Sequence, residues 1–167
     1  MDMKYRLVEI NLDMGRLEYE MYQDIPAKES GSTNLCSGLP FDVFPSFIES
    51  QMARKYQVIS PYDTPTAIYI FYVGENPVGY AGLRLDIDEQ WKKWSGNIFY
   101  AIRSSARGKG YGTALLGAML KEAKRRNINE VLIQSSAGNI ASQKVIEKNG
   151  GILLSEDKGT RYYRIVT

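Results

Sequence analysis

A glycine-rich stretch offers a place for a phosphate group. Residues 107–112 read Arg-Gly-Lys-Gly-Tyr-Gly and lie between an apolar run at 97–102 and a segment with helical periodicity that begins at Tyr111. The glycines leave the backbone amides of the first helical turn uncovered, and the helix dipole favours an anion at that end. Arg107 and Lys109 add positive charge to the same place. The stretch is therefore suited to a diphosphate or polyphosphate group.

Two well-known phosphate loops fit this stretch less well. A P-loop requires Ser or Thr directly after Gly-Lys, whereas Lys109 is followed by Gly110. A dinucleotide fingerprint requires a third glycine where Thr113 stands, and an acid at the far end of the next strand, whereas Glu130 stands at its beginning. The plain alternative is a glycine-rich turn whose charges are simply solvated.

A second stretch further along the chain supports the phosphate interpretation. The pattern Arg107-x-x-Gly110-x-Gly112 after a strand resembles the pyrophosphate loop of the GNAT acetyltransferase superfamily. Residues 139–151 resemble the second GNAT signature, which is an asparagine, a small residue three positions on, and a helix that ends in glycine. The resemblance is sharp over residues 97–151 and looser over residues 66–166.

The composition is that of an ordinary globular chain. The 167 residues are 44% hydrophobic and 24% charged, and 21 basic against 19 acidic side chains give a net charge of +2. We expect one GNAT-like domain over residues 1–167. The charge argues against a nucleic-acid partner, and no apolar run approaches the length of a membrane span. A homodimer is compatible with the sequence.

Cysteine and histidine usage narrows the chemistry. Cys36 is the single cysteine, which is compatible with a reducing cytoplasm, and residues 1–10 lack the apolar core of a signal peptide, so we expect a cytoplasmic protein. The chain has no histidine. Zinc sites with His ligands and Ser-His or Cys-His nucleophilic catalysis within one chain are therefore excluded. No calcium-loop pattern is present either, and we expect no metal.

The hydrophobic pattern predicts the elements that must position these loops. In chain order it gives a strand, two helices, three strands, a helix, a strand, a helix and two strands. This order predicts an α+β fold with a mixed, mostly antiparallel sheet. GNAT domains have the same order, with two central parallel strands that splay apart. The predicted strands are 5–10, 67–73, 78–87, 97–103, 131–135, 151–155 and 161–166, and the predicted helices are 14–22 (with Asp13 as N-cap), 43–56, 111–126 and 140–149.

The resemblance implies that the ligand is acetyl-CoA. Its pantetheine arm would lie between strands 97–103 and 131–135, and its pyrophosphate would bind the amides of the glycine-rich loop. A purely structural role is the alternative for three of the implied residues. Asn139 could be only a helix N-cap, Tyr111 only a core residue and Ser142 only a surface residue. The implied cofactor-binding residues are Ala101, Ile102, Arg107, Gly108, Lys109, Gly110, Tyr111, Gly112, Thr113, Asn139 and Ser142.

Acetyl transfer to an amine requires a proton acceptor for the amine and stabilisation of an oxyanion. Many family members supply a glutamate where this chain has Asn97, and a tyrosine where it has Ile146. Asp86 is our candidate for the missing base, because a strand over 78–87 would place it on one face with Arg84. The alternative is that Asp86 and Arg84 form a structural pair. Tyr163 is a weaker candidate for the acid.

Three functions remain open on the sequence. The favoured one is an N-acetyltransferase that moves acetyl from acetyl-CoA to a primary amine of a small molecule, peptide or protein, by direct attack in a ternary complex. The second is a non-catalytic acyl-CoA binder or sensor, motivated by Asn97 and Ile146. The third is an interaction module for nucleic-acid phosphates, which the near-neutral charge disfavours. We expect residues 29–65 and 156–160 to select the acceptor.

Overall fold

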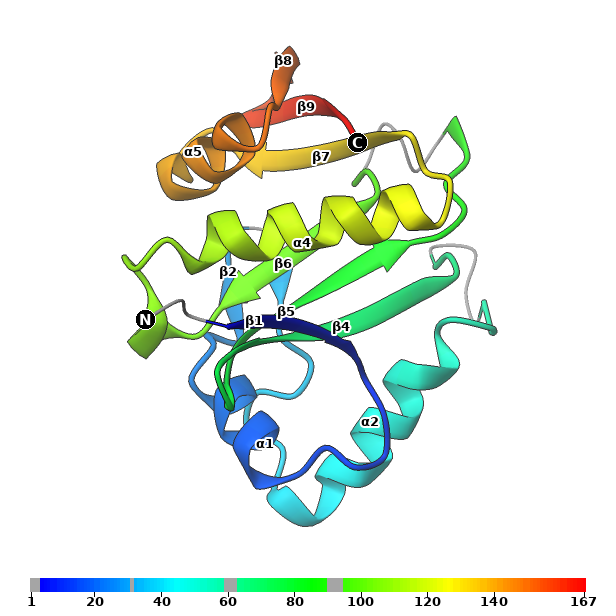
Figure 1. The fold of residues 1–167 in the computed structure, drawn as a ribbon, viewed down its shortest axis with the longest axis vertical. Coiled ribbons are helices and arrows are strands. Elements are labelled where there is room, and N and C mark those ends of the chain that lie inside the picture. Colours follow the sequence, from blue (N-terminus) through cyan, green and yellow to red (C-terminus); the bar gives the residue numbers. More distant parts are fainter. Residues whose placement is uncertain (1–3, 31, 59–62, 90–94) are drawn as a thin grey trace.

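The computed structural model describes residues 4–30, 32–58, 63–89 and 95–167 and contains two main sheets (Figure 1). A four-stranded antiparallel sheet has the order β1-β4-β5-β6, and a three-stranded antiparallel sheet has the order β7-β9-β8. The strands of the first are β1 (Tyr5–Glu9), β4 (Thr66–Val73), β5 (Asn76–Arg84) and β6 (Ile98–Ile102). Those of the second are β7 (Glu130–Ser136), β8 (Ile152–Asp157) and β9 (Thr160–Val166).

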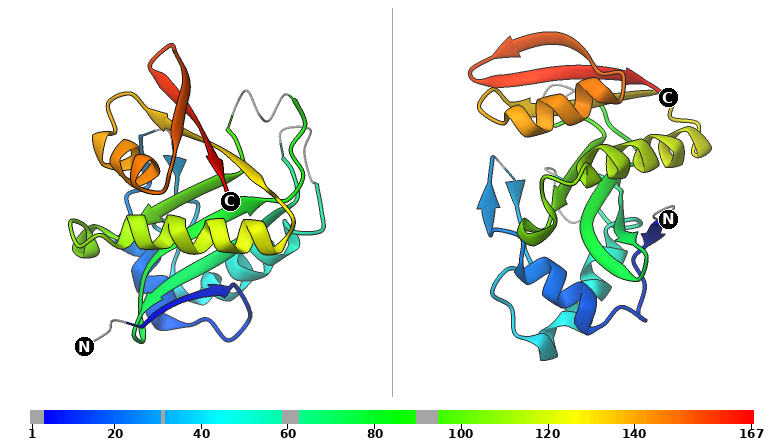
Figure 2. Two further views of the ribbon diagram at one scale, coloured as in Figure 1. Left: turned by 45° about the horizontal axis from the view of Figure 1, so that its top comes forward. Right: turned by 60° about the vertical axis from the view of Figure 1, so that its left-hand side comes forward.

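The helices cover both faces of the four-stranded sheet (Figure 2). One face carries α1 (Arg16–Gln23) and α2 (Phe44–Ala53), and the other carries α4 (Tyr111–Arg125). The helix α5 (Ile140–Lys148) and the three-stranded sheet lie on the α4 side. Among the described residues, no helix is both long enough and apolar enough to cross a membrane.

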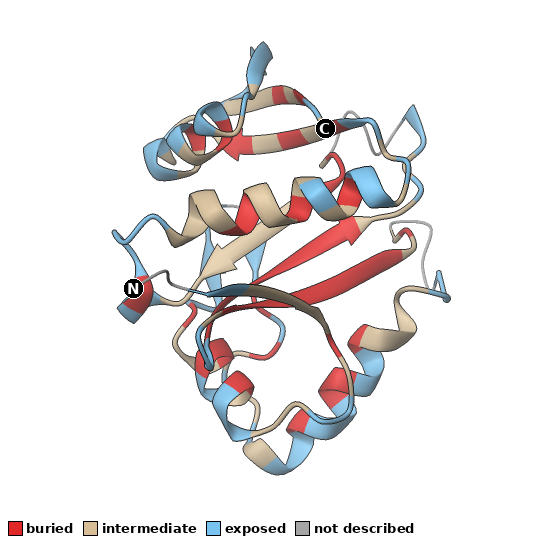
Figure 3. Ribbon diagram, in the orientation of Figure 1, coloured by how far each residue is buried: buried red, intermediate tan, exposed pale blue. Residues whose placement is uncertain are grey.

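Strand β4 explains why the sheet is covered on both faces. It is an unbroken apolar run, buried almost throughout (Figure 3). Because side chains alternate along a strand, Tyr69 and Phe71 point into the core under α4, while Ile68 and Ile70 point into the core against α1 and α2. A run of this kind can be buried only between two layers.

The two sheets meet at one point, next to the start of β6. The Asn97 N–H donates to the Leu132 carbonyl at 2.7 Å, and the Leu132 N–H donates to Asn97 Oδ1 at 2.9 Å. An isolated bridge joins Gly96 to Ile133. Gly96 has φ +69°, and a Cβ there would lie 2.2 Å from the Leu132 carbonyl oxygen, so only glycine allows this approach. Beyond this junction β6 and β7 form no ladder.

The predicted α+β class is confirmed, and most predicted elements differ from the observed ones only at their ends. The strand predicted over 78–87 was wrong at its end, because β5 stops at Arg84. The Leu85 N–H donates to the Pro65 carbonyl, and the Thr64 hydroxyl donates to the Asp86 carbonyl. The backbone after Arg84 therefore forms hydrogen bonds with the connector before β4 and no longer pairs with β6.

Two other local predictions needed correction. Asp13 does not cap the first helix, which begins after Gly15, and the Gly15 N–H donates to the Glu18 carboxylate at 2.7 Å. The loop predicted over 29–40 contains part of a short hairpin of β2 (Lys28–Glu29) and β3 (Ser32–Thr33). Two-residue strands are too short to show a period of two, so the sequence pattern could not reveal them.

We predict that Asn97→Ala destabilises the fold. The change removes the acceptor of the Leu132 N–H at a buried position, and an unsatisfied buried donor costs about 1–3 kcal/mol. Urea unfolding measures the change in free energy. The control is Asn129→Ala, an exposed asparagine for which we expect a change within about 0.5 kcal/mol. Equal midpoints for the two variants would show that the junction does not depend on this side chain.

Candidate active site

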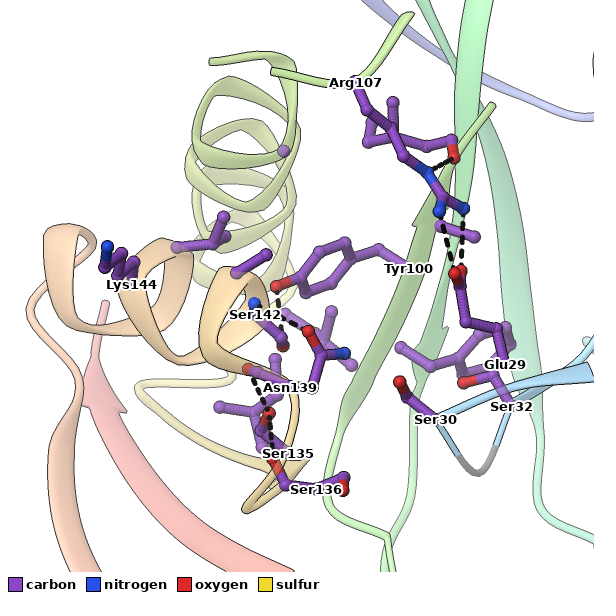
Figure 4. Close-up of a pocket in the computed structure, with 18 of the residues that line it drawn as sticks. Glu29, Ser30, Ser32, Tyr100, Arg107, Ser135, Ser136, Asn139, Ser142 and Lys144 are labelled. Atoms are coloured by element: carbon purple, nitrogen blue, oxygen red, sulfur yellow. Dashed lines mark hydrogen bonds and ion pairs between the residues drawn. The ribbon is translucent and has the colours of Figure 1, made fainter. Parts of the chain in front are cut away.

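A cavity of about 890 Å³ opens where β6 and β7 separate (Figure 4). Its walls come from the β2–β3 hairpin, β6, the glycine-rich loop with the start of α4, the end of β7 and the start of α5. The volume lies within the range of ligand and cofactor sites in proteins. The cavity therefore exists because a sheet ladder is missing, and segments far apart in the sequence line it.

The glycine-rich loop forms one end of the cavity. Gly108 and Gly110 have φ of +76° and +80°, and Gly110 is the N-cap residue of α4. Both glycines line the cavity, so the N–H groups of the first turn of α4, which have no acceptor within the helix, lie beside it. A Cβ on Gly112 would lie 3.2 Å from Val145 of α5, so this glycine lets the two helices approach. This end has the geometry of an anion site.

Arg107 of this loop is held by a carboxylate from the other side of the cavity. Its guanidinium makes two bonds of 2.8 and 2.7 Å to the Glu29 carboxylate on β2, and Nε donates to the Ile102 carbonyl at 3.0 Å (Figure 4). A phosphate bound to the loop would therefore share Arg107 with Glu29 or displace Glu29. Lys109 is exposed and does not line the cavity.

Among the strands of the described residues, none pairs with the second edge of β6. The first edge pairs with β5, with Tyr80 opposite Ala101 and Gly79 opposite Ile102. Ala101 and Ile102 both line the cavity. The cavity-side edge of β6 therefore presents backbone groups that could pair with an extended ligand, as a further strand would.

The start of α5 forms the opposite wall. Asn139 Oδ1 accepts the Ser142 N–H at 3.1 Å, so Asn139 is the N-cap of α5 and also lines the cavity. The Ser142 hydroxyl lies 3.0 Å from the hydroxyl of Tyr100, which reaches across from β6 (Figure 4). Burial raises the pKa of Tyr100 to about 12, and the hydrogen bond with Ser142 acts in the opposite direction. Tyr100 is therefore a neutral phenol at neutral pH, and its hydroxyl forms a hydrogen bond with Ser142 inside the cavity.

Sequence reasoning missed Tyr100 as a candidate. The chain has 12 tyrosines, so composition gives no reason to choose one of them. Alternation along β6 was the usable signal, since it places Tyr100 and Ile102 on the face toward α4 and α5.

The structure does not bring the two catalytic candidates from the sequence to the cavity. Asp86 is exposed beyond the end of β5, and Tyr163 is buried within the three-stranded sheet between Ile133 and Leu153. Neither lines the cavity. Of the described residues that do line it, Glu29 is the one carboxylate, and Arg107 holds it.

The two positions where the family often has titrating groups have structural roles here. Asn97 is 5% exposed and spans the junction of the two sheets. Ile146 is fully buried in the core under α5, where a Cβ on Gly151 would lie 2.4 Å from its side chain. Of the proposed cofactor-binding residues, all except Lys109 line the cavity.

Comparison with known families identifies the class of protein. A family model described as the acetyltransferase (GNAT) family matches residues 39–151, which is more than half of the chain. The chain therefore belongs to the GNAT acetyltransferase family. The predicted family and the predicted enzyme class, N-acetyltransferase, are confirmed. A search of curated proteins finds no match.

Solved structures show the same fold at low sequence identity. The microcin C7 self-immunity acetyltransferase MccE, in complex with acetyl-CoA and AMP, has a TM-score of 0.70 at 16% identity, over 100% of this chain and 94% of that one. The ribosomal L7/L12 alpha-N-protein acetyltransferase RimL, in complex with coenzyme A, has a TM-score of 0.71 at 15% identity, over 99% and 95%. Campylobacter jejuni PseH, in complex with acetyl coenzyme A, has a TM-score of 0.64 at 13% identity, over 98% and 99%.

We predict that Gly110→Val weakens acetyl-CoA binding at least about tenfold, the effect of losing about 1.4 kcal/mol. The left-handed backbone at Gly110 is unfavourable for a β-branched residue, so the loop must rearrange. Calorimetry measures the affinity. Gly38→Val is the matched control, because Gly38 has φ +79° but lies away from the cavity. If both variants bind like the unmodified protein, the glycine-rich loop is not the phosphate site.

Proposed function

We propose that this chain transfers an acetyl group from acetyl-CoA to a primary amine of a small molecule, peptide or protein, by direct attack in a ternary complex. One observation carries the proposal: a cavity between separated strands with an anion site at one end and an unpaired strand edge along one wall. A long ligand with a pyrophosphate at one end needs this combination. The solved relatives that contain acetyl-CoA support this ligand.

The residues proposed for the cofactor divide into three groups. The loop around Gly108 and Gly110 would bind the pyrophosphate through backbone N–H groups. The backbone of Ala101 and Ile102 would pair with the pantetheine arm. Asn139 would contact the arm from α5 through the part of its amide that does not cap the helix. The remaining proposed members of this set are Arg107, Lys109, Tyr111, Gly112, Thr113 and Ser142.

The transfer itself needs no protein nucleophile, because a thioester is already activated toward an amine. A backbone N–H of β6 near Ala101 would stabilise the oxyanion. The hydroxyl of Tyr100 would protonate the departing thiolate, since it is the neutral phenol beside Ser142 in the cavity. The proton that the attacking amine nitrogen loses would then return to the Tyr100 phenolate through solvent. Within the described ranges, no group of three or more His, Cys, Asp or Glu side chains could hold a metal, and we propose a mechanism without one.

A non-catalytic acyl-CoA-binding protein is the second candidate function. It is favoured by the structural roles of Asn97 and Ile146 and by the absence of an unpaired carboxylate among the described residues that line the cavity. Turnover of acetyl-CoA in the presence of an amine panel separates the two functions. A cytoplasmic location, one domain over residues 1–167 and a homodimer stay predictions. For the dimer, the exposed edge strand β8 with Ile152, Leu153 and Leu154 is the surface to test first.

We predict that Tyr100→Phe lowers kcat by roughly 10- to 100-fold and leaves acetyl-CoA affinity within about threefold. The reason is the loss of the acid hydroxyl, with the ring and its packing retained. Steady-state kinetics measures kcat, and calorimetry measures the affinity for acetyl-CoA. Tyr56→Phe, at an exposed tyrosine outside the cavity, is the control. An unchanged kcat would remove Tyr100 from the mechanism.

We predict that Asp86→Asn leaves turnover within about threefold, because the exposed Asp86 does not line the cavity. The amine would then arrive already neutral from solution, and the rate would climb with pH toward the pKa of the amine, near ~10.4 for an alkyl amine. The pH–rate profile of both proteins checks this. A drop of about 100-fold in the variant, with loss of a limb below neutral pH, would restore Asp86 as the base.

A further inference from the structure

A second, smaller cavity adjoins the large one on the α1–α2 side of the sheet. Its volume is about 40 Å³, and Asn34, Tyr80 and Phe99 line both cavities. Since a water molecule needs about 10–15 Å³ of such space, the smaller cavity holds a group of roughly three heavy atoms. The other described residues that line it are Tyr22, Thr33, Leu35, Phe47, Gln51, Arg54 and Ile68.

The Tyr80 hydroxyl is a hydrogen-bond donor at the junction of the two cavities. The residue is 8% exposed, and its hydroxyl makes no hydrogen bond with any other described residue. Burial raises the pKa of Tyr80 to about 12, although the positive charge of Arg54 acts in the opposite direction. The hydroxyl is therefore protonated, and it belongs to a buried residue that lines both cavities.

Arg54 supplies a positive charge to the same small cavity. Its guanidinium donates to Gln51 at 3.1 Å and forms an ion pair of 3.5 Å with an Asp63 oxygen that also accepts the Thr64 N–H. A guanidinium has five N–H donors, so this pattern leaves donors for a ligand. Arg84 lines neither cavity, but its guanidinium lies over the ring of Phe99, which lines both. Burial together with the charge of Arg54 lowers the pKa of Arg84 to about 10.

We propose that the Tyr80 hydroxyl and the Arg54 guanidinium bind a carboxylate of the acceptor, so that the acceptor is a primary amine that also carries a carboxylate, such as an amino acid. The inference rests on the proposed acetyl transfer to amines. Both groups donate hydrogen bonds, and the small cavity matches the size of a carboxylate. A polycationic acceptor fits less well, because Glu29, the one carboxylate among the described lining residues, is held by Arg107.

The test compares amines in matched pairs, for example phenylalanine with phenethylamine and lysine with cadaverine, at saturating acetyl-CoA. We expect kcat/KM to be at least about tenfold higher for the member that carries the carboxylate. Tyr80→Phe and Arg54→Gln should each raise KM for that member about tenfold and leave kcat/KM for its partner unchanged. Arg125→Gln, an exposed arginine outside both cavities, is the control.

The outcomes separate this inference from the proposed function. Acetylation of both members at equal rates, with no effect of either variant, overturns the carboxylate subsite and leaves the transferase intact. If no amine is acetylated, calorimetry measures whether phenylalanine binds to the CoA-loaded protein. Binding that Tyr80→Phe abolishes supports the subsite in a protein that is not a transferase, and no binding overturns it. Because Tyr80→Phe keeps the aromatic ring, this variant alone still tests the carboxylate subsite if Arg54→Gln fails to fold.

Discussion

The site depends on a ladder that stops after its first contact. Asn97 ties β5, β6 and β7 together, because its carbonyl accepts the Arg84 N–H while its amide N–H and its side chain bond to Leu132. A continued ladder would close the space between β6 and β7. Their separation opens the cavity and leaves one strand edge without a partner, and the start of α4 faces the opening. An asparagine suits this junction because its side-chain oxygen accepts the neighbouring N–H without placing a charge in the core.

Charge is arranged differently in the large cavity and in the small cavity beside it. At the loop end, Arg107 is paired with Glu29, so the β2–β3 hairpin and the anion site are linked by one ion pair. An ion pair that is partly exposed contributes little to stability, so a phosphate can compete for Arg107 at low cost. In the small cavity, Arg54 lies among aromatic lining residues and is paired with Asp63, while Arg84 lies over the Phe99 ring. The positive charge there suits an acceptor that brings its own negative charge.

Two tyrosines, Tyr80 and Tyr100, supply hydroxyl groups to the proposed carboxylate subsite and to the proposed mechanism. Burial keeps the phenols of Tyr80 and Tyr100 protonated through the neutral range, so both can donate hydrogen bonds and neither can act as a base there. The described part of the cavity thus contains acids and donors but no unpaired carboxylate. In the proposed mechanism, deprotonation of the amine is therefore left to solvent, and the chemistry depends on positioning and on the electrostatic environment.

The sequence by itself determined the family, the α+β class and the position of the glycine-rich loop, because these follow from short-range signals. The glycines at the helix start, the apolar periodicity and the spacing from Gly110 to Asn139 are all visible along the chain, and the structure gives Gly108 and Gly110 φ near +80°. Only the tertiary structure decided which side chains share the cavity. Asp86 lies outside the cavity because the backbone after Arg84 forms its hydrogen bonds with the connector before β4. Tyr100 and Tyr80 line the cavity because strand separation and helix packing bring residues together that are distant in the chain. No local sequence pattern encodes such contacts.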